Sequence, residues 1–398
     1  GAAQRSGLGS VSLFRRAPLR RTARGFTMKA VVLVGGLTTT MRPLTLTLPL
    51  PLLPFANKAL IMHQLQALKE AGATEVIFCI NARTIPKVLT EAIEQGAVEC
   101  DVKVAISQEK EGFGTAGSLK FAEALITANG TNTAPFFVVN SDVLCSYPLR
   151  DLLHVHMKSG RLGTLLVTRS QSPSKYGVAV IDERTGMVKH FVANPQTFMS
   201  DVVTAGVYVF SPSIFEHIKQ SKKVSMNEVL PRLAADEQLH SMLLTGYWVK
   251  ITDAASYMDA VGSHLEIMRF MSPASLLSAP TAEAAGYVVH GDVMVHESAS
   301  VAKGCELGPR VVIGPHCVVQ QGVRLEDVTL LEGATVCAHS LVKRSLIGWR
   351  STFGKWCFVE DSLLGEEVEV SEALLVKGAT ILPHKELTEN IRKEQIVI

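Results

Sequence analysis

The sequence lacks any apolar run of the ~20 residues needed to cross a lipid bilayer, so no membrane-spanning helix is expected. It also has little charge, at 19%, and few aromatic residues, at 6%, while hydrophobic residues make up 47% of its 398 positions. This composition excludes disorder as the state of the whole chain. A chain of this length is sufficient for two domains that each bury a sizeable core.

Cysteine pairs of the CxxC type are also absent. The seven cysteines are an odd number and fall mostly in apolar runs: Cys79, Cys100, Cys145, Cys305, Cys317, Cys337 and Cys357. Buried cysteines in such runs are typical of reduced thiols in an intracellular protein. A disulfide framework is therefore not expected.

Acidic residues are missing from residues 1–27, which carry six arginines. Taking these six charges from the formal net charge of +2 leaves −4 for the rest, so nucleic-acid binding by the body of the protein is not expected. An arginine-rich segment with Ser and Ala and no acids is typical of a mitochondrial transit peptide. The expected location is mitochondrial, and the alternative is a solvated basic tail on a cytoplasmic protein.

Residues 28–271 alternate between strand-like and helix-like segments, which predicts an α/β domain with a mostly parallel sheet. The apolar run Ala30–Val34 is the expected first strand, and Gly35 and Gly36 follow it directly. A later buried strand ends at Asn140, just before Asp142. Ligands of such sheets bind at the carboxyl ends of the strands, where the glycines and Asp142 both lie.

Residues 272–285 are rich in Ser, Pro and Ala and are predicted to link this domain to a second one at 286–398. There, aliphatic residues recur every six positions, as at Val289, Val295, Val301, Leu307, Ile313, Val319, Leu325 and Leu331. After a slip they resume at Leu341, Ile347, Phe353 and Val359, and then at Leu364, Val370, Val376 and Leu382. This period predicts a left-handed parallel β-helix, a continuous solenoid usually used for protein partners or homo-oligomers.

The β-helix raises the alternative of a zinc enzyme with histidines on adjacent coils. Its histidines are His290, His296, His316 and His339. Their spacings give no His-x4-His pair and no evident partner for a metal-bound imidazole. Surface positions are expected for all four.

The segment from Met28 to Phe55 is where the sequence resembles a known family. It keeps Gly35, Gly36, Arg42-Pro43-Leu44-Thr45, Pro49, Pro51 and Phe55, followed by Asn57 and Lys58. These residues resemble the nucleotidyltransferases that make nucleotide sugars, and most closely the GDP-mannose pyrophosphorylase family. The resemblance runs from about Met28 to Ile398 and implies a Rossmann-like nucleotidyltransferase domain followed by the β-helix.

The resemblance implies that several phosphate-handling positions have changed. The residues that differ from the family pattern include Thr38 for Gly, Thr40 for Arg, Leu50 for Lys, Asn194 for Lys and Lys250 for Asp. Others match positions that the family uses to bind its substrates: Gly35, Gly36, Arg42, Gln108, Gly114, Thr115, Lys175, Tyr176 and Gly177. Asn140-Ser141-Asp142-Val143 is similar to a motif that the family has at the end of a strand, so the resemblance implies that Asp142 is a metal ligand.

No cofactor is expected, although the resembled family uses Mg²⁺. Lys250 stands where the resemblance implies a second metal-binding carboxylate. Its ammonium would repel a cation beside Asp142 by about 4 kcal/mol per pair of unit charges, even with strong screening. We expect Lys250 to form a salt bridge with Asp142 instead.

Three functions are open at this point. Loss of one preorganised charge-stabilising group commonly costs ~10²–10³ in rate, and several are replaced here. The preferred hypothesis is therefore a non-catalytic structural subunit, acting in a larger mitochondrial assembly. The alternatives are a regulatory paralogue that binds a nucleotide sugar, and a surviving mannose-1-phosphate guanylyltransferase.

Overall fold

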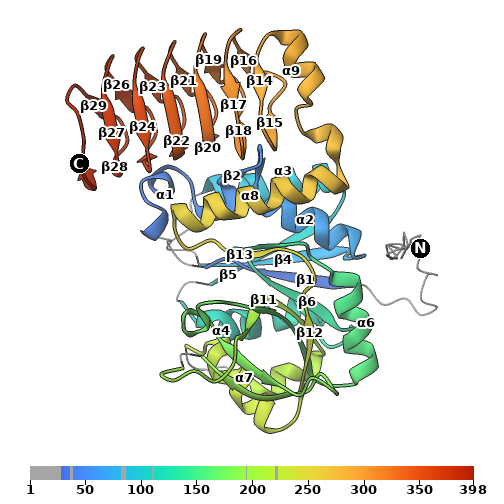
Figure 1. The fold of residues 1–398 in the computed structure, drawn as a ribbon. Coiled ribbons are helices and arrows are strands. Elements are labelled where there is room, and N and C mark those ends of the chain that lie inside the picture. The colour runs from blue at the N-terminus through green and yellow to red at the C-terminus, as the bar shows by residue number, and fades with distance from the viewer. Residues whose placement is uncertain (1–27, 36–38, 82–86, 110–111, 194, 220–222) are drawn as a thin grey trace, which may run out of the picture.

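The computed structural model describes residues 28–35, 39–81, 87–109, 112–193, 195–219 and 223–398. The chain forms an N-terminal α/β domain and a C-terminal β-helix that is stacked on it. Helix α8, Ala254–Met271, lies between the two (Figure 1). In the described part of the chain, no helix combines the length and the apolar character needed to cross a bilayer.

The N-terminal domain is built on a nine-stranded sheet. Its main path runs β10-β9-β11-β6-β1-β4-β5, with β8 beside β11 and β12 beside β8. The strands are β1 (Lys29–Leu33), β4 (Glu75–Asn81), β5 (Lys103–Glu109), β6 (Phe136–Asn140), β8 (Gly163–Arg169), β9 (Val178–Ile181), β10 (Val188–Val192), β11 (Val202–Phe210) and β12 (Leu239–Leu243).

The sheet is mixed, not mostly parallel as the sequence predicted. Strands β1, β4, β5 and β6 are parallel, whereas β11 runs antiparallel to β6, β8 and β9. Parallel neighbours require a crossover, and helices supply it between the first strands. Strands β9 and β10 follow each other with a short turn and no helix, so they pair antiparallel.

Helices cover both faces of the sheet because successive side chains of each strand point to opposite sides. In β1, Val31 packs with residues of α4, α5 and α7, whereas Ala30 and Val32 pack with α2, α3 and α6. The helices are α1 (Leu44–Thr47), α2 (Leu60–Glu70), α3 (Lys87–Cys100), α4 (Gly114–Phe121), α5 (Glu123–Ile126), α6 (Leu149–Ser159) and α7 (Met226–Ala235).

The predicted linker contains ordered structure of its own. It holds a short 3-10 helix, Pro273–Ser275, and helix α9, Ala279–Ala285, which contacts the first strand of the solenoid. Leu277 packs against the interior cluster of the β-helix. The segment therefore covers the N-terminal end of the solenoid.

The second domain is a left-handed parallel β-helix of short strands. Val301 pairs with Val319, Val319 with Val336, and Val336 with Phe353, so each coil takes 17 or 18 residues. The strands are β14 (Val288–Val289), β15 (Val293–Val295), β16 (Ser300–Val301), β17 (Glu306–Leu307), β18 (Val311–Ile313), β19 (Val318–Val319), β20 (Arg324–Leu330), β21 (Thr335–Val336), β22 (Leu341–Ile347), β23 (Thr352–Phe353), β24 (Phe358–Glu360), β25 (Leu363–Leu364), β26 (Glu369–Val370), β27 (Leu375–Lys377), β28 (Ala379–Ile381), β29 (Glu386–Leu387) and β30 (Gln395–Val397).

The six-residue period identifies the interior with a few one-residue errors. The interior cluster contains Leu330, Val342 and Ile381, not the predicted neighbours Leu331, Leu341 and Leu382. In each 17-residue coil one side takes five residues and not six, as between Leu325 and Leu330 and between Val342 and Ile347, so a strict six-residue count misses the inward position by one residue. Leu331 instead packs against the N-terminal domain.

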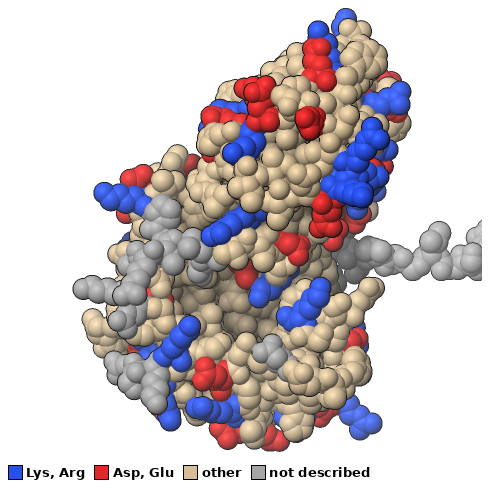
Figure 2. Space-filling model, turned by 90° about the vertical axis from the view of Figure 1, so that its left-hand side faces the viewer, with Lys and Arg blue, Asp and Glu red and all other residues tan. Residues whose placement is uncertain are grey.

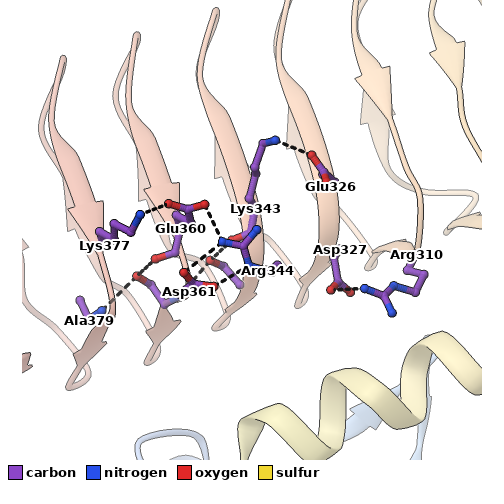
Figure 3. A network of polar contacts seen from close by, with 11 residues as sticks. Arg310, Glu326, Asp327, Lys343, Arg344, Glu360, Asp361, Lys377 and Ala379 are labelled. Atoms are coloured by element: carbon purple, nitrogen blue, oxygen red, sulfur yellow. Dashed lines mark hydrogen bonds and ion pairs between the residues drawn. The ribbon is translucent and has the colours of Figure 1, made fainter. Parts of the chain in front are cut away.

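Charged residues form a line along one edge of the β-helix (Figure 3). Arg310, Asp327, Arg344 and Asp361 occupy equivalent positions in successive coils, all with positive φ between 41° and 54°. The Nη2 atom of Arg310 lies 2.6 Å from Oδ2 of Asp327, and Nε of Arg344 lies 2.6 Å from Oδ1 of Asp361. Pairing between coils satisfies charges on an edge that faces α8.

A shared apolar cluster joins the two domains. On the N-terminal side it contains Met41, Leu50 and Phe55, and on the β-helix side it contains Trp349 and Leu363. Its remaining buried members are Leu44, Leu53, Ala56, Leu60, Leu144, Ile251, Tyr257, Ala260, Val261, Leu265, Met294, Val312, Leu331 and Leu346. The segment that follows β1 is thus packed directly onto the solenoid.

Candidate active site

The main cavity lies at the carboxyl ends of β1, β4, β5 and β6, where the sheet topology predicts a ligand site. It has a volume of about 410 Å³. It is lined by Gly35 two residues beyond β1, by Asn140 at the end of β6 and by Asp142 just beyond that strand. The backbone N–H of Ser141 donates to the Leu33 carbonyl at 3.0 Å, which holds the two strand ends together. Figure 2 shows a hollow below the β-helix with basic side chains at its rim.

Gly114 and Thr115 form the wall of this cavity at the start of α4. Gly114 has φ of 76°, and a Cβ atom there would lie 2.6 Å from the Val224 carbonyl oxygen. Only glycine fits this position without strain. The hydroxyl of Thr115 accepts a hydrogen bond from the Met226 N–H at 2.9 Å, so the wall is tied to α7.

Lys250 and Asp142 meet as the sequence predicted. Strand β13 (Trp248–Lys250) pairs antiparallel with β7 (Val143–Cys145), and this register places Lys250 opposite Val143. The Nζ atom of Lys250 lies 3.5 Å from Oδ2 of Asp142, with both side chains about one-third exposed. The predicted ion pair is therefore confirmed.

A second cavity of about 190 Å³ adjoins the first. Lys175, Tyr176 and Gly177 line it, as do Ala205 and Gly206 of β11. Its aromatic wall is fixed by Trp248, whose indole N–H donates to the Ala205 carbonyl at 2.9 Å and whose ring meets Tyr176 edge to face. Thr115, Asn140 and Lys250 line both cavities, so the two spaces meet at these residues.

The other replaced positions are distributed unevenly around the site. Leu50 is buried in the interdomain cluster and also lines the main cavity. The hydroxyl of Thr40 donates to the Thr252 carbonyl, and neither Thr40 nor Arg42 lines either of the two cavities described above. Three of the named positions lie outside the described residues: Gly36, Thr38 and Asn194.

Glu109 lines the main cavity, and sequence reasoning missed it. Gln108, which the resemblance implied, is exposed and does not line either cavity, because neighbouring residues of β5 point to opposite faces. Burial raises the pKa of the Glu109 carboxyl, which accepts from the Ser118 hydroxyl at 3.0 Å. The alternation of side chains along β5 was the signal that could have found it.

Lys223 is a second residue that sequence reasoning missed. It is exposed, precedes α7 and lines the main cavity. No motif marks it, because it lies far along the sequence from the strands whose ends form the cavity. It gives the cavity a cation in addition to Lys250.

All seven cysteines are free thiols. Burial raises the pKa of Cys79, which lines the main cavity, to about 12. A thiol in that state is a poor nucleophile. In the β-helix, His290 contacts Glu306 and His339 stacks on Trp356 with ring centroids 4.5 Å apart.

The residues present do not fit the Mg²⁺ ion that the resemblance implies. Magnesium requires several hard oxygen ligands in near-octahedral geometry. Among the described residues, no group of three His, Cys, Asp or Glu side chains could hold a metal. The ammonium of Lys250 beside Asp142 would repel a divalent cation at that carboxylate.

Two family models match the chain. The model described as "Nucleotidyl transferase" matches residues 29–266, and that described as "GMPPB C-terminal domain" matches residues 289–397. The chain is also similar to the probable mannose-1-phosphate guanylyltransferase 3 of Oryza sativa subsp. japonica, with 41% identity. It is 40% identical both to mannose-1-phosphate guanylyltransferase 1 of Arabidopsis thaliana and to the mannose-1-phosphate guanylyltransferase catalytic subunit beta of Dictyostelium discoideum. Each match covers 93% of this chain and 100% of the relative.

Solved structures agree with the fold of the N-terminal domain. A putative glucose-1-phosphate thymidylyltransferase from Bacillus anthracis matches with a TM-score of 0.52 and 19% identity, over 59% of this chain and 94% of that one. A UDP-glucose pyrophosphorylase in complex with UDP-glucose matches with a TM-score of 0.50 and 20% identity, over 61% and 100%. At these identities the likeness shows the fold alone.

The mixed sheet with this cavity at its strand ends, together with the match to the nucleotidyl transferase model, identifies a nucleotidyltransferase domain followed by a β-helix. Within that class, the chain belongs to the GDP-mannose pyrophosphorylase (mannose-1-phosphate guanylyltransferase) family.

The hypothesis of a non-catalytic structural subunit is contradicted by these relatives. They match along their whole length and are named as guanylyltransferases, one of them as a catalytic subunit. The hypothesis counted each replaced residue as lost function. It overlooked that positive charge can reach a cavity from a different segment, as Lys223 does here.

Proposed function

We propose that this protein is a mannose-1-phosphate guanylyltransferase. The observation that carries the proposal is the 40–41% identity to curated guanylyltransferases across their full length. The two adjoining cavities support it, because a nucleotide sugar has two parts joined by a diphosphate. The larger space suits a nucleoside, and the smaller one, with its aromatic wall, suits a hexose.

The reaction would join GTP and mannose 1-phosphate. An oxygen of the sugar phosphate attacks the α-phosphorus of GTP, the bond between the α-phosphorus and the bridging oxygen breaks, and pyrophosphate leaves. The protein contributes mainly positioning and charge neutralisation in such a transfer. Lys250 and Lys223 provide positive charge at the cavity where the phosphates would lie.

The test is an assay of GDP-mannose and pyrophosphate formation from GTP and mannose 1-phosphate with the full chain. We expect both products in equal amounts. The Lys223→Ala variant should lose about 10-fold in kcat/KM, consistent with the loss of one charged contact to phosphate. Formation of neither product by a folded protein, with and without divalent metal, would contradict the proposal.

A second candidate function is a regulatory paralogue that binds a nucleotide sugar without turnover. The ion pair between Lys250 and Asp142 favours it, because this pair replaces an implied metal site. Tight binding of GDP-mannose by a protein that forms no pyrophosphate would identify this function.

We also propose a mitochondrial location and association with protein partners or further copies through the β-helix. The arginine-rich composition of residues 1–27 supports the location, and the solenoid supports the association. The test of location is organelle fractionation of the tagged full chain against a variant with the six arginines changed to Gln. Equal distributions of the two proteins would contradict the proposed location.

A further inference from the structure

Lys250 places a positive charge beside Asp142, at the position where the resemblance implies a metal-binding carboxylate. Its side chain lines both cavities. The diphosphate of a nucleotide sugar joins the nucleoside to the sugar, so it must pass between the two spaces. Lys250 therefore stands where the ligand carries its negative charge.

The position of Lys250 is fixed by backbone structure on both sides. Its strand β13 pairs with β7, and the N–H of the next residue, Ile251, donates to the Asp142 carbonyl at 2.8 Å. Ile251 is itself buried in the interdomain cluster. The ammonium is thus held near Asp142 by a short ribbon, without a flexible loop.

The ion pair leaves both partners able to bind a ligand. An ammonium has three N–H donors, and the contact to Asp142 at 3.5 Å is longer than a normal hydrogen bond. On Asp142, the Oδ1 atom is buried and has no hydrogen-bond partner among the described residues. A buried carboxylate oxygen without a partner is costly, and a ligand hydroxyl would satisfy it.

The charge of the site is balanced without a metal. Two carboxylates with Mg²⁺ would sum to zero, and one carboxylate with one ammonium also sums to zero. A diphosphate therefore meets the same total charge in either arrangement. What differs is that the cation at this site is a side chain.

We propose that Lys250 replaces the divalent cation, so that the site binds nucleoside diphosphate sugars independently of divalent metal. The inference rests on the proposed function, because it takes a nucleotide sugar as the ligand. The ammonium of Lys250 donates to the diphosphate, and Oδ1 of Asp142 accepts from a ligand hydroxyl.

The test is isothermal titration of the full chain with GDP-mannose, once in EDTA and once in millimolar Mg²⁺. We expect the Kd of the wild-type protein to agree within about 2-fold between the two conditions, because no metal has to bridge ligand and protein. Tighter binding by more than about 10-fold in Mg²⁺ would overturn the proposal.

The Lys250→Asp variant inverts the charge and rebuilds a carboxylate pair with Asp142. In EDTA it should bind GDP-mannose at least about 10- to 100-fold more weakly, as expected for the loss of one charged hydrogen bond. Addition of Mg²⁺ should restore much of this loss. A variant that binds equally well in EDTA would show that Lys250 does not hold the diphosphate.

Two further variants keep the result interpretable. Lys250→Gln removes the charge with little change in size, so a folded Gln variant tests the charge even if the Asp variant does not fold. Lys189→Gln is the matched control, because Lys189 lies on β10, pairs with Glu237 and lines neither cavity. Absence of GDP-mannose binding in every condition would instead contradict the proposed ligand, and metal-dependent binding would contradict only the role of Lys250.

Discussion

Leu50 stands where the resembled family has a phosphate-binding lysine, and in this structure it has a packing role instead. It is 5% exposed, packs in the cluster between the domains, and forms part of the cavity wall. A lysine there would have to keep its charge out of that cluster. The replacement therefore exchanges a phosphate contact for apolar packing between the domains.

His156 is a buried histidine that makes the stability of the protein depend on pH. It is 2% exposed, and its ring contacts the Thr164 hydroxyl at 3.0 Å and the Ser211 hydroxyl at 3.1 Å. Burial, with a smaller effect of His240, lowers the pKa of His156 to about 4 from 6.5. Because the unfolded chain binds the proton more readily, stability is full above pH 6.5 and is lost as the pH falls towards 4.

At pH 5 this loss amounts to about 2 kcal/mol from His156 alone. The measurement is the free energy of unfolding by urea between pH 7 and pH 5. The His156→Gln variant keeps a hydrogen-bonding side chain that does not titrate, so its curve should fall about 2 kcal/mol less than that of the wild type. Parallel curves for the two proteins would refute the assignment, whatever the absolute stability of the variant.

Trp349 joins the coils of the β-helix to the segment between β1 and α2. Trp349 is 6% exposed and packs in the same cluster as Leu50. Trp349→Ala should lower the free energy of unfolding by about 3–5 kcal/mol. It should also weaken GDP-mannose binding, because Leu50 lines the cavity.

Trp356→Ala is the matched control in the same solenoid. Trp356 is 64% exposed, and its ring stacks on that of His339. Its removal should cost less than about 1.5 kcal/mol and leave binding unchanged. Equal effects of the two substitutions, measured by urea unfolding and titration calorimetry, would mean that Trp349 does not hold the segment between β1 and α2.

The elements were predictable from the sequence where their pattern is local. At the start of helix α7, Met226–Ala235, Ser225 and Glu228 form a capping box, which is a signal of this local kind. Strand direction in the second half of the sheet was not predictable, because it depends on connections and not on composition. Likewise, the meeting of Lys250 and Asp142 was predicted from the implied motif, whereas Lys223 reaches the cavity from a segment that no motif marks.

The molecule as a whole is organised around a contact between distant parts of the chain. The first segment after β1 is covered by coils near Trp349 and Leu363, and the side chain of Thr47 donates to Glu366 at 2.9 Å. The β-helix is therefore part of the support of the cavity as well as a separate domain. Sequence periodicity predicted the solenoid but gave no information about which of its faces would meet the other domain.

Because this contact joins distant parts of the chain, its two sides are synthesised at different times. A ribosome adds about 5–20 residues each second. The segment around Met41 thus waits for roughly 300 further residues, on the order of 15–60 seconds, before Trp349 exists to cover it. Until then its apolar side chains are open to other chains and to chaperones, so the first wall of the cavity to be synthesised is among the last parts of the protein to reach its final packing.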